Sequence, residues 1–206
     1  MYKNFIKRLL DLFLSSIGII ILIPFMLAIA IAIIIDDPGA VVFTQKRVGI
    51  HKKNFRIFKF RTMKVNTPHD TPTHMLINPD EYITRVGYFL RKTSLDEIPQ
   101  LFNILFGDMS IIGPRPALWN QEDLILERDK YHANNIRPGL TGWAQINGRD
   151  ELVIYDKAKL DGEYVKKMSF AFDWMCFLGT ITSVLKRGGV IEGGTGELQR
   201  KAEIEM

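Results

Sequence analysis

Two adjacent carboxylates, Asp96 and Glu97, are the residues of this sequence best suited to chemistry. Neighbouring side chains diverge by roughly 100° on a helix and 180° on a strand, so the pair is poorly placed to share one proton. It is well placed for two separate tasks around one substrate, in which one carboxylate attacks and the other holds a cation. Aspartate can accept a phosphoryl group covalently, and carboxylates bind Mg²⁺ together with phosphate oxygens.

The same residues also have a structural interpretation, because Ser94 and Glu97 have the spacing of a helix capping box. Acidic side chains in a first helical turn favour the helix dipole as well. Pro99 argues against a helix that begins at Leu95, since there it would remove a backbone hydrogen bond. We expect Pro99 to be the first helical residue and Ile98 to lie outside the α region, which places the acidic pair just ahead of the helix.

Basic residues and glycines flank the acidic pair and favour a phosphorylated ligand. Arginine forks match phosphate oxygens, and glycines allow a backbone to come close to a ligand. Each of these residues taken alone is more easily explained as a surface charge or a turn, whereas together they indicate a binding site. The candidates are Lys59 and Arg61 on one face of a strand, Arg85, Arg91, Arg115, and the pair Arg137 and Arg149 on either side of the glycine-rich stretch 138–148.

Other catalytic and metal-binding patterns are weak or missing from the sequence. His69 and His74 share a proline-rich loop with Asp70, but their spacing fits no standard zinc site. There is no Gly-x-Gly-x-x-Gly fingerprint, no Walker loop and no Gly-x-Ser-x-Gly elbow. The single cysteine, Cys176, excludes an intrachain disulfide and fits a reducing compartment.

The 206-residue chain joins an apolar segment to a charged remainder. Residues 12–35 carry no charge and 20 of these 24 residues are apolar, so all 27 basic and 23 acidic residues lie elsewhere. This division excludes a purely soluble enzyme, a polytopic transporter, a disordered protein and a disulfide-rich secreted module. The net charge of +4 is too small to indicate nucleic acid, but it suits an anionic membrane surface or a phosphorylated substrate.

The apolar segment is long enough to cross a membrane, because its helix would measure about 36 Å against a hydrocarbon core of about 30 Å. Lys3, Lys7 and Arg8 precede it and would place the N-terminus in the cytoplasm. Pro24, near its middle, leaves the carbonyl of Ile20 without a donor and should kink the helix. A kinked helix can cross or return to the same face; the residues alone favour crossing and leave both open.

The remainder predicts a small, mostly helical domain with a short pair of strands, and therefore an α+β fold. Strands are expected at 39–45 and 54–61, the second because its apolar residues alternate. Most helices should contribute to the core, and part of the last should lie in the membrane interface. From their three- and four-residue apolar spacing, helices are expected at 82–92, 97–106, 123–131, 151–167 and 172–186, with a long loop at 64–80.

Several longer motifs resemble those of the small monotopic phosphoglycosyl transferases, the bacterial sugar transferases that begin glycoconjugate assembly. The resemblance covers about residues 7–182, and its motifs occur in the family's order. They are Lys7-Arg8 with Asp11, QKRVG at 45–49, FKFRTM at 58–63, SLDEIPQ at 94–100 with Asn103, GDMSIIGPRP at 107–116, RPGLTGWAQINGR at 137–149, and Asp161 with Tyr164-Val165.

The resemblance implies transfer of a phosphosugar from a UDP-sugar, expected to be N-acetylated, to undecaprenyl phosphate with release of UMP. Asp96 would be the nucleophile and carry a covalent phosphosugar, Glu97 would bind Mg²⁺, and Lys59 would complete the catalytic group. Later glycosyltransferases of the same assembly would be further partners. The substrate-binding residues that the resemblance implies are Arg61, Arg91, Arg115, Arg137, Gln145, Arg149 and Asp161.

The resemblance further implies a re-entrant helix hairpin with both ends at the cytoplasmic face of the bacterial inner membrane, and Pro24 becomes its break. Ile23 stands where the family often has serine, so another group would have to bond the freed carbonyl. Phe106 replaces a common lysine and would add apolar surface at the membrane. The implied parts are a membrane-associated re-entrant helix at 1–37, a catalytic domain at 38–187 and a mobile tail at 188–206.

Two other functions remain open on the sequence. In one, Asp96 acts as a base for the lipid phosphate during direct transfer within a ternary complex. In the other, the protein is a non-catalytic membrane partner that binds nucleotide sugars or scaffolds later glycosyltransferases. The scaffold would be favoured by loss of Asp96, Glu97 or Lys59, and all three are present.

Overall fold

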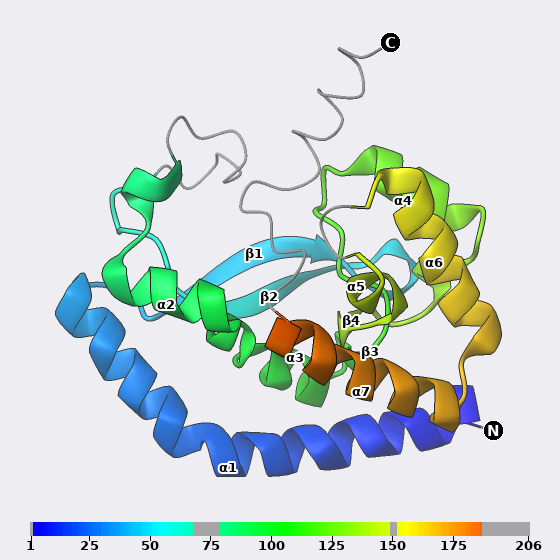
Figure 1. Cartoon of the computed structure of the whole chain (residues 1–206), viewed down its shortest axis with the longest axis horizontal. Helices are drawn as coiled ribbons and strands as arrows, with labels where there is room; N and C mark the ends of the chain where they lie inside the picture. The colour runs from blue at the N-terminus through cyan, green and yellow to red at the C-terminus, as the bar shows by residue number, and fades with distance from the viewer. Residues whose placement is uncertain (1, 68–78, 149–151, 187–206) are drawn as a thin grey trace.

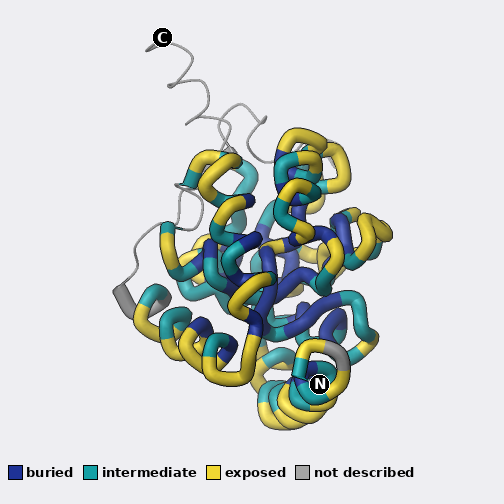
Figure 2. The backbone as a smooth tube through the Cα atoms, turned by 90° about the vertical axis from the view of Figure 1, so that its right-hand side faces the viewer, coloured by how far each residue is buried: buried dark blue, intermediate teal, exposed yellow. Residues whose placement is uncertain are grey.

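The computed structural model describes residues 2–67, 79–148 and 152–186 and has the predicted α+β fold (Figure 1). Helices surround two small sheets, and the buried backbone gathers at the centre (Figure 2). Arg149, the histidines of the 64–80 loop and the tail 188–206 lie outside the described residues. The elements are a π-helical turn (Tyr2–Ile6), α1 (Lys7–Asp36), β1 (Val42–Val48), η2 (Ile50–Lys52), β2 (Asn54–Phe60), η4 (Pro79–Tyr82), α2 (Arg85–Thr93), η5 (Leu95–Glu97), α3 (Gln100–Phe106), β3 (Ser110–Ile112), α4 (Glu122–Asp129), η6 (Ala133–Asn135), β4 (Gly139–Thr141), α5 (Trp143–Ile146), α6 (Ile154–Lys167) and α7 (Phe170–Lys186).

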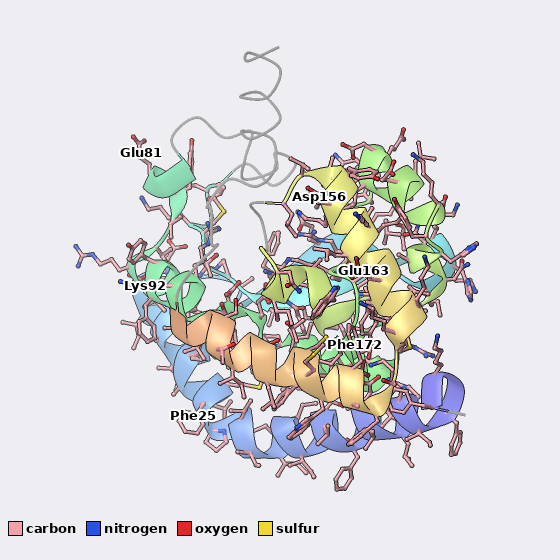
Figure 3. All side chains as sticks on the ribbon, turned by 45° about the vertical axis from the view of Figure 1, so that its right-hand side comes forward. Phe25, Glu81, Lys92, Asp156, Glu163 and Phe172 are labelled. Atoms are coloured by element: carbon pink, nitrogen blue, oxygen red, sulfur yellow. The ribbon has the colours of Figure 1, made fainter. Side chains whose placement is uncertain are left out.

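The apolar segment forms one helix, α1, which by length and composition is the one helix among the described residues that could cross a membrane. This helix bends, and its two halves follow different sides of the domain (Figure 1). Pro24 lies inside it, and Phe25, labelled beside the bend in Figure 3, is 62% exposed. The predicted kink is confirmed, but the structure does not show a hairpin.

The second half of α1 packs on the domain and ends in polar contacts. Buried Ile33 shares an apolar cluster with Phe60 of β2 and Leu90 of α2. At the end of the helix, Asp36 Oδ2 accepts a hydrogen bond from the backbone N–H of Val86 in the first turn of α2, at 2.8 Å. A carboxylate at a helix N-terminus is favoured by the helix dipole, so this contact fixes α1 relative to α2.

Charged side chains in the first half of α1 bind backbone groups of α3 and β3. Arg8 donates to the carbonyl oxygens of Ile104 at 2.7 Å and Leu105 at 3.1 Å, both in the last turn of α3. Asp11 Oδ1 accepts from the N–H of Ile111 in β3 at 3.0 Å. Because the last carbonyls of a helix lack partners within it, the Arg8 guanidinium stabilises the end of α3.

A buried network joins the start of the chain to α7. Lys7 Nζ lies 2.6 Å from Asp173 Oδ2, and the hydroxyl of Tyr2 donates to the same oxygen at 2.6 Å. The hydroxyl of Tyr164 donates to Asp173 Oδ1 at 2.7 Å. Both oxygens of this buried carboxylate are therefore paired, which offsets the cost of removing its charge from water.

Strands β1 and β2 form an antiparallel hairpin in which Phe43 lies opposite Lys59. The buried amide of Asn103 in α3 continues the ladder on the outer edge of β2. Its Oδ1 accepts from the N–H of Phe58 at 2.9 Å, and its Nδ2 donates to the carbonyl of Arg56 at 2.8 Å. Asn103 thereby satisfies two backbone groups and fixes the part of β2 that carries Lys59.

The second sheet, β3 and β4, is a short parallel pair that the sequence analysis did not predict. It depends on glycines: an ideal Cβ on Gly139 would lie 2.1 Å from the backbone nitrogen of Gly113. Part of the glycine-rich stretch therefore serves close backbone packing. Strand β1 also lies three residues later than expected, since the residues before Val42 form the connection from α1.

The packing around two helical glycines, Gly87 in α2 and Gly18 in α1, predicts different effects of a Gly→Ala change on stability. In α2, an ideal Cβ on Gly87 would lie 2.0 Å from the Thr62 carbonyl oxygen, so Gly87→Ala should destabilise the protein by about 1–3 kcal/mol. The control Gly18→Ala in α1 meets only the flexible Leu101 side chain at 3.3 Å and should be near neutral or stabilising. Thermal unfolding in detergent compares them; equal melting temperatures would contradict the close α2 contact.

Candidate active site

The acidic pair lies in a short 3₁₀ turn between α2 and α3. Ser94 ends α2 with φ of 58°, in the left-handed region, and this reverses the chain before Leu95. The pair precedes α3, as predicted. The capping-box interpretation is wrong, because the side chain of Ser94 makes no capping hydrogen bond.

The detailed geometry predicted for the start of α3 is also wrong. Ile98 has φ of −53° and ψ of −39°, inside the α region. Pro99 is the N-cap, and Gln100 is the first residue of α3. The 3₁₀ turn continues almost directly into α3, and no extended residue lies between the two elements.

Two cations converge on the acidic pair, and they favour Glu97. Lys59 Nζ lies 2.8 Å from Glu97 Oε1 and 3.4 Å from Asp96 Oδ2. Arg115 Nη2 lies 2.8 Å from the same Glu97 oxygen. The carboxylate side chains are 12% exposed for Asp96 and 17% for Glu97, so these contacts are partly shielded from solvent. Three separated segments of the chain thus meet at one carboxylate oxygen.

The two carboxylates have opposite electrostatic properties. Burial raises the pKa of Asp96, the charge of Glu97 adds to the increase, and Lys59 and Arg115 only partly oppose it. Burial also acts to raise the pKa of Glu97, but the charges of Arg115 and Lys59 outweigh it and hold that pKa well below its ordinary value. Glu97 is therefore the stably ionised member, and Asp96 is the more basic one.

The donor set fits a divalent cation that is bound mainly by a substrate. Within the described residues, no group of three or more His, Cys, Asp or Glu side chains gathers, so the protein offers no complete metal cage there. Mg²⁺ commonly takes one or two carboxylates together with phosphate oxygens and water. The formal charges of Asp96, Glu97, Lys59 and Arg115 cancel, and a diphosphate would add negative charge that a divalent cation would neutralise.

Arg61 and Arg91 are both predicted to bind substrate. Arg61 directly follows β2, Arg91 lies in α2, and both make contacts within the protein. The guanidinium of Arg61 binds the carboxylate and the carbonyl oxygen of Asp37. Arg91 Nε donates to the hydroxyl of Thr62 at 2.9 Å. The motif FKFRTM at 58–63 therefore has two roles. Its Lys59 contacts the acidic pair, and its Arg61 joins the end of α1 to the end of β2.

Gln145 comes from the glycine-rich stretch 138–148, and Arg137 directly precedes it. Arg137 Nε donates to the carbonyl oxygen of Gly107 at 2.9 Å. Both polar atoms of the buried Gln145 amide lack a hydrogen-bond partner within the described part of the chain. Because an unpaired buried amide is costly, Gln145 is the member of this stretch best suited to contact a ligand or a water.

Asp161 is buried in α6 and pairs with Arg128 of α4, a residue that the sequence analysis missed. Arg128 Nε lies 2.8 Å and Nη2 2.6 Å from Asp161 Oδ2. Burial raises the pKa of Asp161, and Arg128 opposes the increase. Arg128 follows buried Leu124 by four residues, on the same helix face, and this spacing was the available signal. A contact of Asp161 with substrate stays a prediction.

Comparison with known proteins gives the same family from independent matches. The family described as bacterial sugar transferase matches residues 2–187. The chain is 40% identical over 186 residues to a UDP-glucose:undecaprenyl-phosphate glucose-1-phosphate transferase of Xanthomonas campestris pv. campestris, covering 87% of this chain and 38% of the relative. It is 38% identical over 191 residues to a UDP-N-acetylgalactosamine-undecaprenyl-phosphate N-acetylgalactosaminephosphotransferase of Aeromonas hydrophila, covering 88% and 44%.

A further relative is similar to the chain over nearly its whole length. The exopolysaccharide production protein PSS of Rhizobium leguminosarum bv. phaseoli is 35% identical over 195 residues, which cover 89% of this chain and 96% of the relative. The chain spans well under half the length of the Xanthomonas and Aeromonas proteins.

The electrostatics of the pair predict that Asp96→Asn stabilises the protein at neutral pH. A raised carboxyl pKa means that ionisation costs more in the folded than in the unfolded chain, so an uncharged amide removes a cost above the raised pKa. The gain should vanish as pH falls below the ordinary value of 3.8, where Asp96 is neutral in both states.

Glu97→Gln should have the opposite effect at neutral pH, because it leaves Lys59 and Arg115 without their shared acceptor. Asp156→Asn, in the exposed first turn of α6 (Figure 3), is the matched control. Melting temperatures between pH 3 and 8 test both expectations. A lower melting temperature for Asp96→Asn than for the wild type at pH 7 would contradict this assignment.

Proposed function

Because the chain belongs to the bacterial sugar transferase family, we propose that it transfers a phosphosugar from a UDP-sugar to undecaprenyl phosphate and releases UMP. The names of the Xanthomonas and Aeromonas relatives support this substrate pair. The observation that carries the chemistry is the unequal pairing of the carboxylates: Glu97 accepts both short cation contacts, and Asp96 is left with the long one.

Asp96 is the nucleophile of the first step. One carboxylate oxygen attacks the sugar-bearing phosphorus, forming an oxygen–phosphorus bond, while the bond from that phosphorus to the bridging oxygen breaks. UMP leaves with the bridging oxygen and its electron pair. The raised pKa of Asp96 supports this role, because a more basic oxygen is a better nucleophile.

Undecaprenyl phosphate is the second substrate. One of its phosphate oxygens attacks the same phosphorus, the bond to Asp96 breaks, and the carboxylate is regenerated. The product is a polyprenyl-diphosphate-linked sugar. Two displacements at one phosphorus make this a ping-pong reaction, in which UMP leaves before the lipid reacts.

Glu97, Lys59 and Arg115 form the electrostatic part of the site. Lys59 lies between both carboxylates and, with Arg115, is placed to stabilise charge that develops on phosphoryl oxygens. Glu97, with Asp96 beside it, is the side chain that would hold Mg²⁺. When bound, Mg²⁺ would neutralise the diphosphate and favour departure of UMP.

Both ends of α1 are fixed to the same domain, and this supports a re-entrant topology at the cytoplasmic face of the inner membrane. Arg8 and Asp11 bind α3 and β3 near the start of the helix, while Asp36 and Asp37 bind α2 and Arg61 at its end. A straight helix across the bilayer would place these ends about 30 Å apart on opposite faces. The bend near Pro24 lets the middle of α1 enter the lipid while both ends stay with the domain.

Exposed apolar side chains on three other helices support interfacial contacts of the domain. The first turn of α7 is joined to the first turn of α1 by the ion pair between Asp173 and Lys7. The exposed apolar side chains would gain by burial in the membrane interface. They are Tyr88 and Phe89 of α2, Phe106 of α3, and Phe170, Trp174, Phe177, Leu178 and Ile181 of α7.

The proposal predicts a covalent intermediate on Asp96. Protein incubated with Mg²⁺ and a UDP-sugar labelled in the sugar, without lipid, should retain the label on Asp96 and release one UMP per label. The relatives' names make UDP-glucose and UDP-N-acetylgalactosamine the first sugars to try, alongside other N-acetylated UDP-sugars. Asp96→Asn should abolish label and turnover, and Asp156→Asn should retain both. Mass spectrometry of peptides locates the label.

The outcomes separate the mechanisms. Turnover without label would make Asp96 a base in a ternary complex. Label that persists in Asp96→Asn would exclude this nucleophile. Neither label nor turnover with every UDP-sugar tried would favour the scaffold. Because Asp96→Asn is expected to be at least as stable as the wild type at neutral pH, its inactivity would not reflect unfolding.

The topology predicts that the residues before α1 and the domain after it both face the cytoplasm. Cysteines introduced as Lys3→Cys and Glu122→Cys should resist a membrane-impermeant maleimide in spheroplasts and react in inverted vesicles. Cys176 is buried, so it is a low background. In a Pro24→Ala background the straightened helix should separate its ends, making one cysteine reactive in spheroplasts. Reaction of one cysteine in spheroplasts of the Pro24-containing protein would show a spanning helix.

A further inference from the structure

Arg115 lies in the segment between β3 and α4, outside any helix or strand. Its neighbours Pro114 and Pro116 have no N–H, so neither can donate a backbone hydrogen bond. Yet Arg115 Nη2 reaches Glu97 Oε1 at 2.8 Å, with 43% of the Arg115 side chain exposed. A long, partly exposed side chain keeps one geometry only if its backbone is held in place.

The carbonyl oxygens on either side of Arg115 supply this support. The Pro114 carbonyl accepts from the backbone N–H of Gly139 at 2.8 Å. The Pro116 carbonyl accepts from the guanidinium of Arg47, whose Nη1 lies at 3.0 Å. The backbone on each side of Arg115 is therefore held by a hydrogen bond. One comes from the N–H of Gly139 in β4, and the other comes from the side chain of Arg47 in β1.

Arg47 is itself fixed in two ways. Its Nη2 donates to Gln45 Oε1 at 2.7 Å, so the two ends of the guanidinium fork are engaged. The backbone of β1 is joined to the same segment, because the N–H of Val48 donates to the carbonyl of Ala117 at 3.0 Å. A planar fork with two acceptors holds a defined orientation, which a lysine ammonium would not reproduce.

We propose that Arg47 is a positioning residue for the transferase reaction: its guanidinium holds the Pro116 carbonyl, and Gln45 orients it, so that Arg115 stays on Glu97. This inference rests on the proposed function for its effect on rate, but not for its structural content. In this role Arg47 acts through the Pro116 carbonyl and, beyond it, through Arg115.

A chemical footprint tests the structural content without catalysis. Phenylglyoxal modifies accessible guanidinium groups, and the contact with Glu97 shields one side of the Arg115 fork, so release of Arg115 from Glu97 should raise its modification rate. The Glu97→Gln variant lacks the carboxylate that pairs with Arg115, so it gives the reference modification rate for an Arg115 released from this contact. Arg47→Ala should bring the rate of Arg115 close to that value, as measured by mass spectrometry. Gln45→Ala should give a smaller increase in the same direction.

Arg56→Ala is the matched control, since Arg56 is an exposed arginine of the same hairpin. It should leave the rate of Arg115 at its wild-type value. Arg47→Lys, which keeps the charge but loses the fork, should lie between wild type and Arg47→Ala. Wild-type rates at Arg115 in folded Arg47→Lys or Gln45→Ala would overturn the proposal, even if Arg47→Ala fails to fold.

A double-mutant cycle tests the effect on rate. Arg47→Ala should lower kcat about 10–100-fold, the loss expected when a catalytic group moves by about an ångström. Arg47→Ala combined with Arg115→Ala should be no slower than Arg115→Ala alone, because Arg47 acts through Arg115. Multiplicative losses would overturn the positioning role. Absence of transferase activity in the wild type would count against the proposed function alone, since the footprint would still report the contact.

Discussion

The structure depends on one unequal ion cluster, in which two cations share a single oxygen of Glu97. Bringing two like charges side by side in a partly buried turn is costly unless cations offset it. Here the cations offset the cost more fully at Glu97 than at Asp96, where burial and the charge of Glu97 leave the pKa raised. The stabilising contacts of Glu97 thereby leave Asp96 as the more basic carboxylate.

The elements around the site hold the residues of this cluster in place. The β1–β2 hairpin carries Lys59 and is fixed at its outer edge by Asn103 of α3. The parallel β3–β4 pair anchors the segment that carries Arg115. Helix α1 closes the arrangement from both ends, through Arg8 at the end of α3 and Asp36 at the start of α2. The turn that holds the acidic pair is thus fixed at both of its flanking helices.

The sequence predicts the features that arise from local patterns. Apolar spacing gave α2, α4, α6 and α7 to within a few residues, and the charge-free run gave α1. It missed β3 and β4, because three-residue strands paired through glycines have no alternating pattern. The structure brings Asp96, Glu97, Lys59 and Arg115 together. Arg61 instead pairs with Asp37, and Asp161 pairs with Arg128. The sequence identifies arginines that could lie near a site. Only the tertiary contacts show which of these arginines are already paired with carboxylates of the protein.

The ion pair between Lys7 and Asp173 has a consequence for the order of synthesis. These residues stand 166 positions apart, yet they lock the first turn of α1 to α7. A ribosome makes α1 before α7, so Lys7 exists long before its acidic partner Asp173. During that interval the Lys7 ammonium must be solvated by water or paired with another anion. The first turn of α1 can therefore reach its final place in the domain only after α7 has been made, which makes this contact one of the last to form.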